Sequence, residues 1–307
     1  MFFGTLIFAL LGTLHPLAAQ ELRIEKKPVS IPAGAGQKPF DVTLHAIPLN
    51  DIQSGGPSRD GIPALDHPAF AAASEADPSL RATDLVLGIA TKEAAKAYPV
   101  RILNWHEVIN DNIGNQAVVI SWCPLCGSGL VYDPHVGDRR HTFGVSGLLY
   151  KRNLLLYDHE TDSLWSQLGG KAVTGPLTGT SLRLLPASVT TWAQWRQEHP
   201  DTEVLSFQTG YHRNYSADPY RDWALDRRLA LVVSVPGAVR IYPYAELKKG
   251  GAILKDALAG KEVIIAFDAR NETATLRGAE GEPLPHFVAF LADAKAFYPD
   301  AHIFKAK

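Results

Sequence analysis

The chain has 307 residues, of which 46% are hydrophobic and 20% are charged, and its formal net charge is −2. This is the composition of a globular protein with one large or two medium domains, long enough to bury a core without crosslinks. No basic run stands out among the 30 Lys and Arg residues, so we expect neither a nucleic-acid partner nor an anionic-membrane partner.

Residues 1–20, "MFFGTLIFALLGTLHPLAAQ", predict a signal peptide. The apolar stretch at 2–14 is too short to span a bilayer comfortably, and the small residues Ala18 and Ala19 come before the first charged residue, Glu21. An uncleaved anchor or a buried first helix is the alternative. No later stretch is apolar enough to be transmembrane. We therefore expect an exported protein, periplasmic or secreted, with no membrane insertion after signal removal, in a compartment that permits disulfides.

The next elements alternate between irregular segments and short strands. Residues 21–61 are rich in Pro, Gly and polar residues, and they predict an irregular N-terminal arm with one strand at 42–46. The apolar run at 84–90 predicts a buried strand, and residues 116–122, "QAVVISW", predict another that leads into the cysteines. Between them, residues 102–110, "ILNWHEVIN", predict one or two helical turns.

Two hairpins and a helix are expected after the cysteines. Residues 129–147 predict a hairpin that turns at 134–138, and residues 153–167 predict a second that turns at 159–162. The segment "TTWAQWRQEHP" then predicts a helix that is capped by one of its two leading threonines and ends before its proline.

The sequence contains an internal repeat. Residues 85–103, "LVLGIATKEAAKAYPVRIL", resemble residues 229–247, "LALVVSVPGAVRIYPYAEL", so that Tyr98 falls on Tyr242, 144 positions later (242 − 98). "WRQEHPDTEVL" likewise resembles "AKAFYPDAHIF" at a separation of 99 positions (299 − 200). The second copy is thus 45 residues shorter (144 − 99) and lacks both cysteines. Chance similarity of short apolar strings is the alternative.

These patterns predict an α+β fold that is β-rich and mostly antiparallel, with two unequal internal repeats. We expect the first repeat at 62–210, carrying the Cys-Pro-Leu-Cys site, and the shortened second repeat at 211–307. The strands of both should pair within a shared core, because each repeat is too short to bury itself. A single β-barrel-like domain is the alternative.

Both cysteines of the chain, Cys123 and Cys126, lie in "SWCPLCGSGLVYD". A disulfide that closes only two intervening residues adds little stability, because the entropic gain of loop closure grows with loop length. "CPLCG" has the shape of a metal knuckle, in which two thiolates from one tight turn face a single ion. Since the chain has no second Cys pair, either a histidine completes such a site or the site is incomplete.

His106 is the best candidate of the 11 histidines, because it comes just before the strand that carries the cysteines. It lies in "NWHEVIND", where Asn110 falls on the same face of the predicted helix. Glu107 or Asp111 could orient the imidazole or act on a bound water. Thiolate and imidazole suit a soft or borderline ion such as Cu(I) or Zn(II). The predicted metal ligands are Cys123, Cys126 and His106.

Two other interpretations of the cysteines remain open: a reversible dithiol–disulfide couple that acts on a small molecule, and an inert pair in a non-catalytic scaffold. A thioredoxin fold is disfavoured, because glycines and strand formers rather than a helix follow the second cysteine in "GSGLVYDP". A serine hydrolase is also disfavoured, because Leu148 occupies the place of the last glycine of a nucleophile elbow around Ser146.

Several long motifs of this chain resemble one family. "AYPVRILNWHEVIND", "CPLCGSGLVYD", "FGVSGLLY", "LLLYDHETDSLWSQ" and "TTWAQWRQEHPDTEVLS" are similar to the uncharacterised bacterial family called domain of unknown function 3179, from about Ile62 to the C-terminus. The family's members are typically exported or periplasmic and have no established reaction, so the resemblance implies domain limits and location rather than a mechanism. His141 and His159 stand where the family pattern looks free, which counts against them as ligands.

Together the residues and the resemblance predict a pocket bounded by the cysteines, by His106 and by the hairpins at 143–167. The expected ligand is a small molecule or a metal ion. The predicted catalytic residues are Cys123, Cys126, His106, Glu107 and Asp111, and the predicted cofactor-binding residues are Trp105, Asn110, Ser146, Tyr150, Asp158, Trp165 and Gln167.

Overall fold

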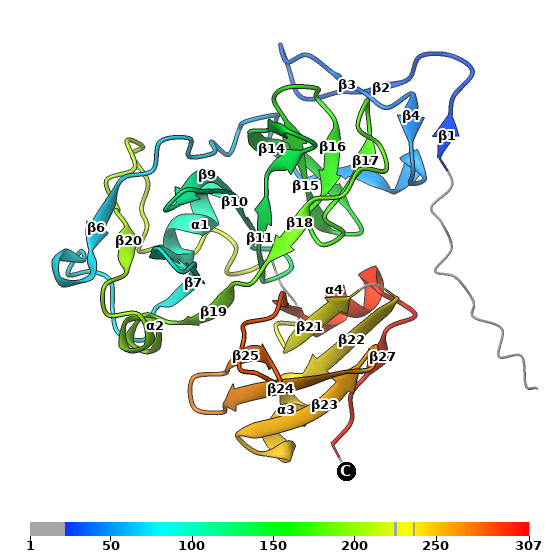
Figure 1. The fold of residues 1–307 in the computed structure, drawn as a ribbon. Helices are drawn as coiled ribbons and strands as arrows, with labels where there is room; N and C mark the ends of the chain where they lie inside the picture. The colour runs from blue at the N-terminus through cyan, green and yellow to red at the C-terminus, as the bar shows by residue number, and fades with distance from the viewer. Residues whose placement is uncertain (1–21, 224–225, 236, 307) are drawn as a thin grey trace, which may run out of the picture.

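The computed structural model describes residues 22–223, 226–235 and 237–306, so the expected signal peptide at 1–20 lies outside the described residues. The protein is β-rich and its sheets are mostly antiparallel (Figure 1). Within the described residues, no helix is long and apolar enough to cross a membrane. The α-helices are short: α1 (Val100–His106), α2 (Trp192–Glu198), α3 (Tyr244–Gly250) and α4 (Leu291–Phe297).

Most of the N-terminal arm is irregular, but three of its short strands join a large sheet. β2 (Ser30–Ile31) pairs with β3 (Phe40–Asp41) in a separate two-stranded sheet. Of the strand expected at 42–46, only the two residues of β4 form a strand. The seven-stranded sheet has the order β1 (Arg23–Ile24), β4 (Leu44–His45), β17 (Lys171–Thr174), β16 (Leu164–Ser166), β15 (Asn153–Asp158), β14 (Phe143–Tyr150) and β5 (Ile52–Ser54).

Two further sheets, with α1 and α2, form what we call the first unit. One sheet has the order β19 (Ser188–Thr191), β7 (Leu85–Ala90), β8 (Ala95–Pro99), β20 (Glu203–Leu205) and β6 (Phe70–Ala72). The other has the order β18 (Arg183–Leu185), β11 (Ser128–Asp133), β10 (Gln116–Cys123) and β9 (Val108–Ile113), and it carries both cysteines at one end.

Two smaller sheets, with α3 and α4, form the second unit, drawn from yellow to red in Figure 1. The first of them has the order β26 (Phe287–Phe290), β21 (Leu229–Val235), β22 (Ala238–Pro243) and β27 (His302–Ile303). The second has the order β23 (Ile253–Leu258), β24 (Lys261–Asp268) and β25 (Thr273–Gly278).

The two units have the same strand order. In β19-β7-β8-β20 and in β26-β21-β22-β27, the last pair of strands is parallel and the others are antiparallel. The helix after β19 (α2) and the helix after β26 (α4) also begin in the same way. The Trp192 amide donates to the Asp84 carbonyl at 2.8 Å, and the Leu291 amide donates to the Arg228 carbonyl at 2.7 Å.

The helix that we expected at 102–110 is shorter and begins earlier. α1 ends at His106, because Glu107 takes a left-handed φ of 56° that an α-helix cannot continue. Val108 then begins β9, which the sequence analysis missed. His106 and Asn110 therefore do not share a helical face, since Asn110 lies in a strand.

The hairpin expected at 129–147 is wrong, whereas the one expected at 153–167 is confirmed. β11 and β14 lie in different sheets, and only the short β12 (His135–Val136) and β13 (Arg139–Arg140) pair around the expected turn. β15 pairs with β16 as predicted. The predicted helix is α2, and Thr191 caps it by accepting from the Gln194 amide at 3.3 Å.

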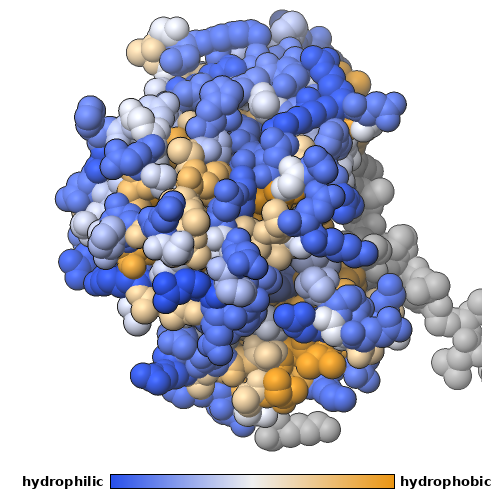
Figure 2. Space-filling model, turned by 60° about the vertical axis from the view of Figure 1, so that its left-hand side comes forward, coloured by the Kyte–Doolittle hydropathy of each residue, from blue (hydrophilic) through white to orange (hydrophobic). Residues whose placement is uncertain are grey.

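The hydrophobic core runs through both units. One cluster joins Leu87 and Ile120 of the first unit to Leu231 and Ile265 of the second. A second cluster holds both cysteines together with Trp165 and Phe287. The face seen in Figure 2 is largely hydrophilic, with apolar side chains in small patches, as expected when the large apolar residues are buried.

Candidate functional site

The cysteines lie in the tight turn between β10 and β11. The Cys126 amide donates to the Cys123 carbonyl at 3.2 Å, which closes the turn. Gly127 follows with a φ of +58°, and a Cβ at this position would lie 2.6 Å from the ring of Phe290 in the second unit. The glycine is therefore required both by the left-handed backbone and by the close approach of an aromatic ring.

The two thiols adjoin and both are buried, with 1% of Cys123 and 0% of Cys126 exposed. They are not bridged. The pKa of the Cys126 thiol is raised well above its usual value, first by its interaction with the Cys123 thiol and then by burial. The Cys126 thiol donates to the Arg152 carbonyl at 3.4 Å. Both effects favour the protonated form of Cys126.

A buried amide network supports Cys126 from the seven-stranded sheet. Asn153 Nδ2 lies 3.7 Å from the Cys126 sulfur and donates to Gln167 Oε1 at 2.7 Å. Gln167 also accepts from the Ser128 hydroxyl at 3.0 Å and donates to the Ser128 carbonyl at 3.1 Å. Because these amides are bonded on both sides, they fix the position of the Cys126 side chain.

Glu107 and Tyr220 form a polar pair near Cys123. The Tyr220 hydroxyl donates to Glu107 Oε1 at 2.7 Å. Burial raises the pKa of Glu107 to about 7, and the Tyr220 bond opposes this shift only in part. The pKa of Tyr220 is raised by burial and by the charge of Glu107, with a smaller contribution from Cys123. A buried carboxyl that titrates near neutral pH can accept and return a proton at this site.

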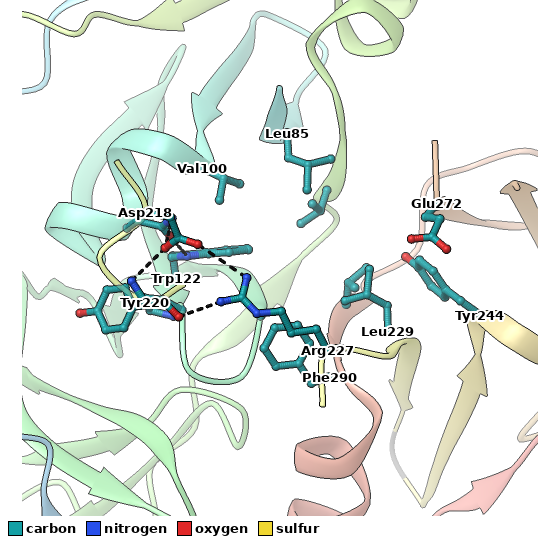
Figure 3. Close-up of a pocket in the computed structure, with 15 residues that line it drawn as sticks. Leu85, Val100, Trp122, Asp218, Tyr220, Arg227, Leu229, Tyr244, Glu272 and Phe290 are labelled. Carbon is teal, nitrogen blue, oxygen red and sulfur yellow. Dashed lines mark hydrogen bonds and ion pairs between the residues drawn. The ribbon is translucent and has the colours of Figure 1, made fainter. Parts of the chain in front are cut away.

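Cavities lie on both sides of the cysteine turn, and Tyr220 lines both. The larger, of about 340 Å³, is lined by Pro124 and Gly127 of the turn and by Trp122 and Tyr220 (Figure 3). The smaller, of about 230 Å³, is lined by Leu125 at the tip of the turn and by Glu107 and Tyr220. Neither thiol lines either of these two cavities and both are buried, so a reactant reaches the sulfurs only when the surrounding structure opens.

His106 is not brought to the cysteines as a third ligand. Its Nδ1 lies 2.8 Å from the Pro63 carbonyl, which can only accept, so this nitrogen carries the proton. Nε2 lies 2.7 Å from the Tyr215 hydroxyl and accepts from it. Burial lowers the pKa of His106 and so keeps it neutral. Both ring nitrogens are therefore engaged, and among the described residues His106 and the cysteines do not form a three-ligand group.

Asp111 lies on the opposite face of the β9–β10 sheet from Cys123. Successive strand residues alternate faces, and Asp111 points toward β8, where it pairs with Lys96 at 3.0 Å and accepts from the Tyr98 hydroxyl at 2.7 Å. The second unit repeats this arrangement without any cysteine nearby. Its members are Arg240, Tyr242 and Asp256. This repetition favours a structural role for Asp111.

The predicted binding residues are spread over several places, most of them inside the core. Asn110 bridges β9 to β14 by accepting from the Phe143 amide at 2.9 Å and donating to the Phe143 carbonyl at 2.8 Å. Ser146 donates to the Leu155 carbonyl at a bulge of β14. Gln167 alone among them reaches a cysteine, through Asn153.

The aromatic candidates do not share one site. Trp105 donates to the Ala217 carbonyl at 3.3 Å, away from the cysteines. Trp165 is fully buried in the same cluster as Cys123 and Cys126, so only this tryptophan packs with them as expected. Tyr150 packs edge-on against the Phe297 ring.

Asp158 belongs to a separate polar group around His141. His141 Nδ1 lies 3.3 Å from Asp158 and 3.4 Å from Glu160, and these are the residues of the described chain that could hold a metal ion through three close ligand atoms. Asp158 also accepts from Thr161 and from the Trp165 indole at 2.9 Å. The resemblance had counted against His141 as a ligand.

Sequence reasoning missed three residues of the cysteine site: Tyr220, Asn153 and Phe290. Tyr220 and Phe290 come from segments distant in sequence from the cysteines, in regions with no motif of their own. Asn153 could have been found, because it is a polar residue at the start of an otherwise apolar strand, "NLLLYD".

The pattern of a family described as "Protein of unknown function (DUF3179)" matches residues 59–231, which is more than half of the chain. The match includes the cysteine turn, Glu107 and Tyr220, and it ends just inside β21 of the second unit. No curated protein and no solved structure gives a match.

Proposed function

We propose that this chain, which belongs to the DUF3179 family of proteins of unknown function, is a thiol–disulfide oxidoreductase that acts on a small disulfide or dithiol. The observation that carries the proposal is the pair of adjoining, unbridged thiols of Cys123 and Cys126, which have no third ligand among the described residues. Glu107 is the nearby group that exchanges protons near neutral pH.

The two cysteines take different parts in the proposed step. Cys123 attacks, as the thiolate, one sulfur of the substrate disulfide; the substrate S–S bond breaks and one thiol leaves with a proton. Cys126 then loses its proton and attacks Cys123 in the mixed disulfide. The second substrate thiol leaves, and the protein holds a Cys123–Cys126 disulfide. Two electrons and two protons thus pass from the protein dithiol to the substrate, and the reverse reaction oxidises a dithiol.

Three features support this assignment of roles. Cys126 holds its proton against the Arg152 carbonyl, and its pKa is raised, so it is suited to the second, resolving step. The Asn153 amide keeps it in place. Cys123 lies near Tyr220 and Glu107, which can take and return protons as thiolates form and leave.

The test equilibrates purified protein in glutathione buffers of graded redox ratio and counts trapped thiols by intact mass. We expect molecules with two free thiols or none, because the pair oxidises as a unit. Cys126→Ser should accumulate a mixed disulfide between Cys123 and glutathione, whereas Cys123→Ser should form one much more slowly. A pair that stays reduced at every ratio would show that the turn is inert, and equal trapping in both variants would overturn the assigned roles.

Metal binding is the second candidate function. Two facing thiols are sufficient for Cu(I), which accepts two soft ligands, whereas Zn(II) normally needs four. Reduced protein should then take up one Cu(I) ion against a competing chelator, and Cys123→Ser should abolish this uptake. A wild type that binds Cu(I) tightly and whose thiols resist glutathione disulfide would favour metal binding over redox chemistry.

We also infer that the two units are unequal internal repeats that share one ancestry. Three observations support this inference. The two units have the same strand order, and α2 and α4 begin with equivalent backbone hydrogen bonds. The ion pair of Lys96 with Asp111 also recurs in the second unit as Arg240 with Asp256. An experimental structure in which residues 85–123 do not superpose on residues 229–268 would remove this inference.

Export is part of the proposal, because a disulfide couple can operate in an oxidising compartment. Its support is the sequence of residues 1–20. The mature protein should begin near residue 20 or 21 when it is expressed with its own leader. Intact-mass measurement that finds Met1 retained would contradict export.

A further inference from the structure

The larger cavity beside the cysteine turn lies at the seam between the two units. Side chains from both units line it, and several of them are separated by the sequence offsets of the internal repeat, 144 or 99 positions. The two units thus contribute equivalent positions to the cavity wall. Figure 3 shows several of these side chains facing the same space from opposite sides. The matched pairs are Leu85 with Leu229, Val100 with Tyr244, and Val189 with Val288.

This seam cavity is mostly apolar, with Asp218 and Arg227 on one side and Glu272 on the other (Figure 3). The Trp122 indole is held in place by its hydrogen bond to Asn104 Oδ1 at 2.7 Å, and Phe290 forms the floor beside it. Asp218 and Arg227 lie 3.6 Å apart and so largely neutralise each other. A volume of about 340 Å³ is at the small end of the range for ligand pockets, about 300–1,000 Å³.

A second cavity, of about 730 Å³, adjoins the seam cavity. Both are lined by the same four residues, so the two cavities border each other there. On its far side the second cavity is bounded by α3 and by the chain after β27. The shared residues are Arg227, Leu229, Tyr244 and Glu272.

The lining of this second cavity contains four basic side chains and two acidic ones, Glu246 and Glu272, and so carries an excess of positive charge. Arg228 is paired with Asp226, and Glu246 is paired with Lys249 at 2.6 Å. Lys248 and Lys305 also line the cavity, and within the described part of the chain neither has a carboxylate oxygen within 4.0 Å. Glu246, which also interacts with Lys305, and Glu272 offset this charge only in part, so the two lysines favour an anionic group at this end.

We propose that the two bordering cavities open into each other and together bind a single-chain amphiphile with a carboxylate head, in the manner of a fatty acid. The apolar chain lies in the seam cavity between Leu85 and Leu229, and the carboxylate faces Lys248 and Lys305. Apolar burial supplies most of the affinity, and the lysines select the charge of the head group. The site is separate from the thiol chemistry, because neither sulfur lines either cavity.

The test is a fluorescence titration of the full chain with cis-parinaric acid and with its methyl ester, which differ only in the charge of the head group. The acid should bind with a dissociation constant roughly tenfold lower than the ester, and added salt should reduce this difference. The double change Lys248→Glu with Lys305→Glu should remove the preference for the acid. Leu85→Trp, which fills the seam from a partly exposed position, should weaken both probes.

Two control variants make the result specific. Lys92→Glu reverses an exposed lysine in the β7–β8 turn that lines neither cavity, and it should leave both titrations unchanged. The double change Cys123→Ser with Cys126→Ser should also bind the acid normally, so that failure of the redox proposal would not affect this one. Equal binding of acid and ester by the wild type, or equal loss in Lys92→Glu and in the Lys248 and Lys305 variant, would overturn the proposal.

Discussion

The Phe290 amide donates a hydrogen bond of 2.7 Å to the Cys126 carbonyl, and so ties the cysteine turn of the first unit to the second unit. The Phe290 ring lies against Gly127, the next residue of the turn. Asp293 of α4 pairs with Arg152 at 3.2 Å, and the Arg152 carbonyl accepts from the Cys126 thiol. The second unit has no cysteine of its own, yet it holds the dithiol in position.

This relationship predicts the effect of a methyl group at Gly127. Gly127→Ala should destabilise the protein by about 2–4 kcal/mol, because it combines a left-handed φ with a clash against the Phe290 ring. Gly137→Ala is the matched control: its φ of +59° is nearly the same, and nothing lies within 4 Å of the added carbon. Denaturant unfolding should therefore show a clearly smaller loss in Gly137→Ala. Equal losses would mean that Phe290 does not press on the turn.

A second prediction concerns Asp111, which the sequence analysis took as a catalytic candidate. Asp111→Ala should cost about 3 kcal/mol of unfolding free energy, because it leaves Lys96 half-buried without its partner. The dithiol redox potential should stay unchanged, since Asp111 lies on the opposite face of the sheet. Asp256→Ala, the equivalent change in the second unit, should cost less because that pair is more exposed. A shifted potential in Asp111→Ala would restore its place in the site.

The position of the His106 side chain could not be predicted from the sequence. Proximity in sequence suggested that an imidazole next to the cysteine strand would reach the thiols. However, α1 ends at His106 and the ring is turned toward Pro63 and Tyr215. The next residue, Glu107, takes a left-handed φ and accepts from Tyr220, and it is Tyr220 that interacts with Cys123. The residue at which such a helix ends depends on tertiary packing, and the hydrophobic periodicity of the sequence does not reveal it.

The strand pattern was easier to predict than its pairing. Runs such as "QAVVISW" and "NLLLYD" mark strands by composition, and the offset between Tyr98 and Tyr242 indicated matching segments. β14 pairs with β15 through the two-residue turn at Lys151 and Arg152, and on its other side with β5, which lies about 90 residues earlier in the chain; neither pairing was predicted. Tyr220 and Phe290 likewise reach the cysteines from distant parts of the chain, so no local motif could reveal them.

A third prediction tests Tyr220 as the barrier to the thiols. Tyr220→Ala joins the two cavities that flank the turn, and it should speed labelling of Cys123 by a thiol reagent at least about tenfold, because access requires less opening. Tyr211→Ala is the control: it removes a ring from the same connecting segment, where Tyr211 contacts His106 and lines neither cavity. Stopped-flow labelling under native conditions measures both. Equal rates in the two variants would place the entrance elsewhere.

The last prediction follows from the pKa of Glu107, which burial raises to about 7. The folded protein then binds a proton at Glu107 more tightly than the unfolded chain, so this group favours folding at acid pH. The contribution of Glu107 to the free energy of unfolding should fall by at most about 3 kcal/mol between pH 4.5 and 7 and stay constant above pH 7.

Two variants test this dependence. Glu107→Gln keeps an acceptor for Tyr220 and should remove it, whereas Glu280→Gln, on an exposed turn, should not. The measurement is urea unfolding at a series of pH values. A wild-type profile that parallels Glu107→Gln across this range would show that Glu107 titrates outside it and cannot serve the thiols as a proton acceptor near neutral pH.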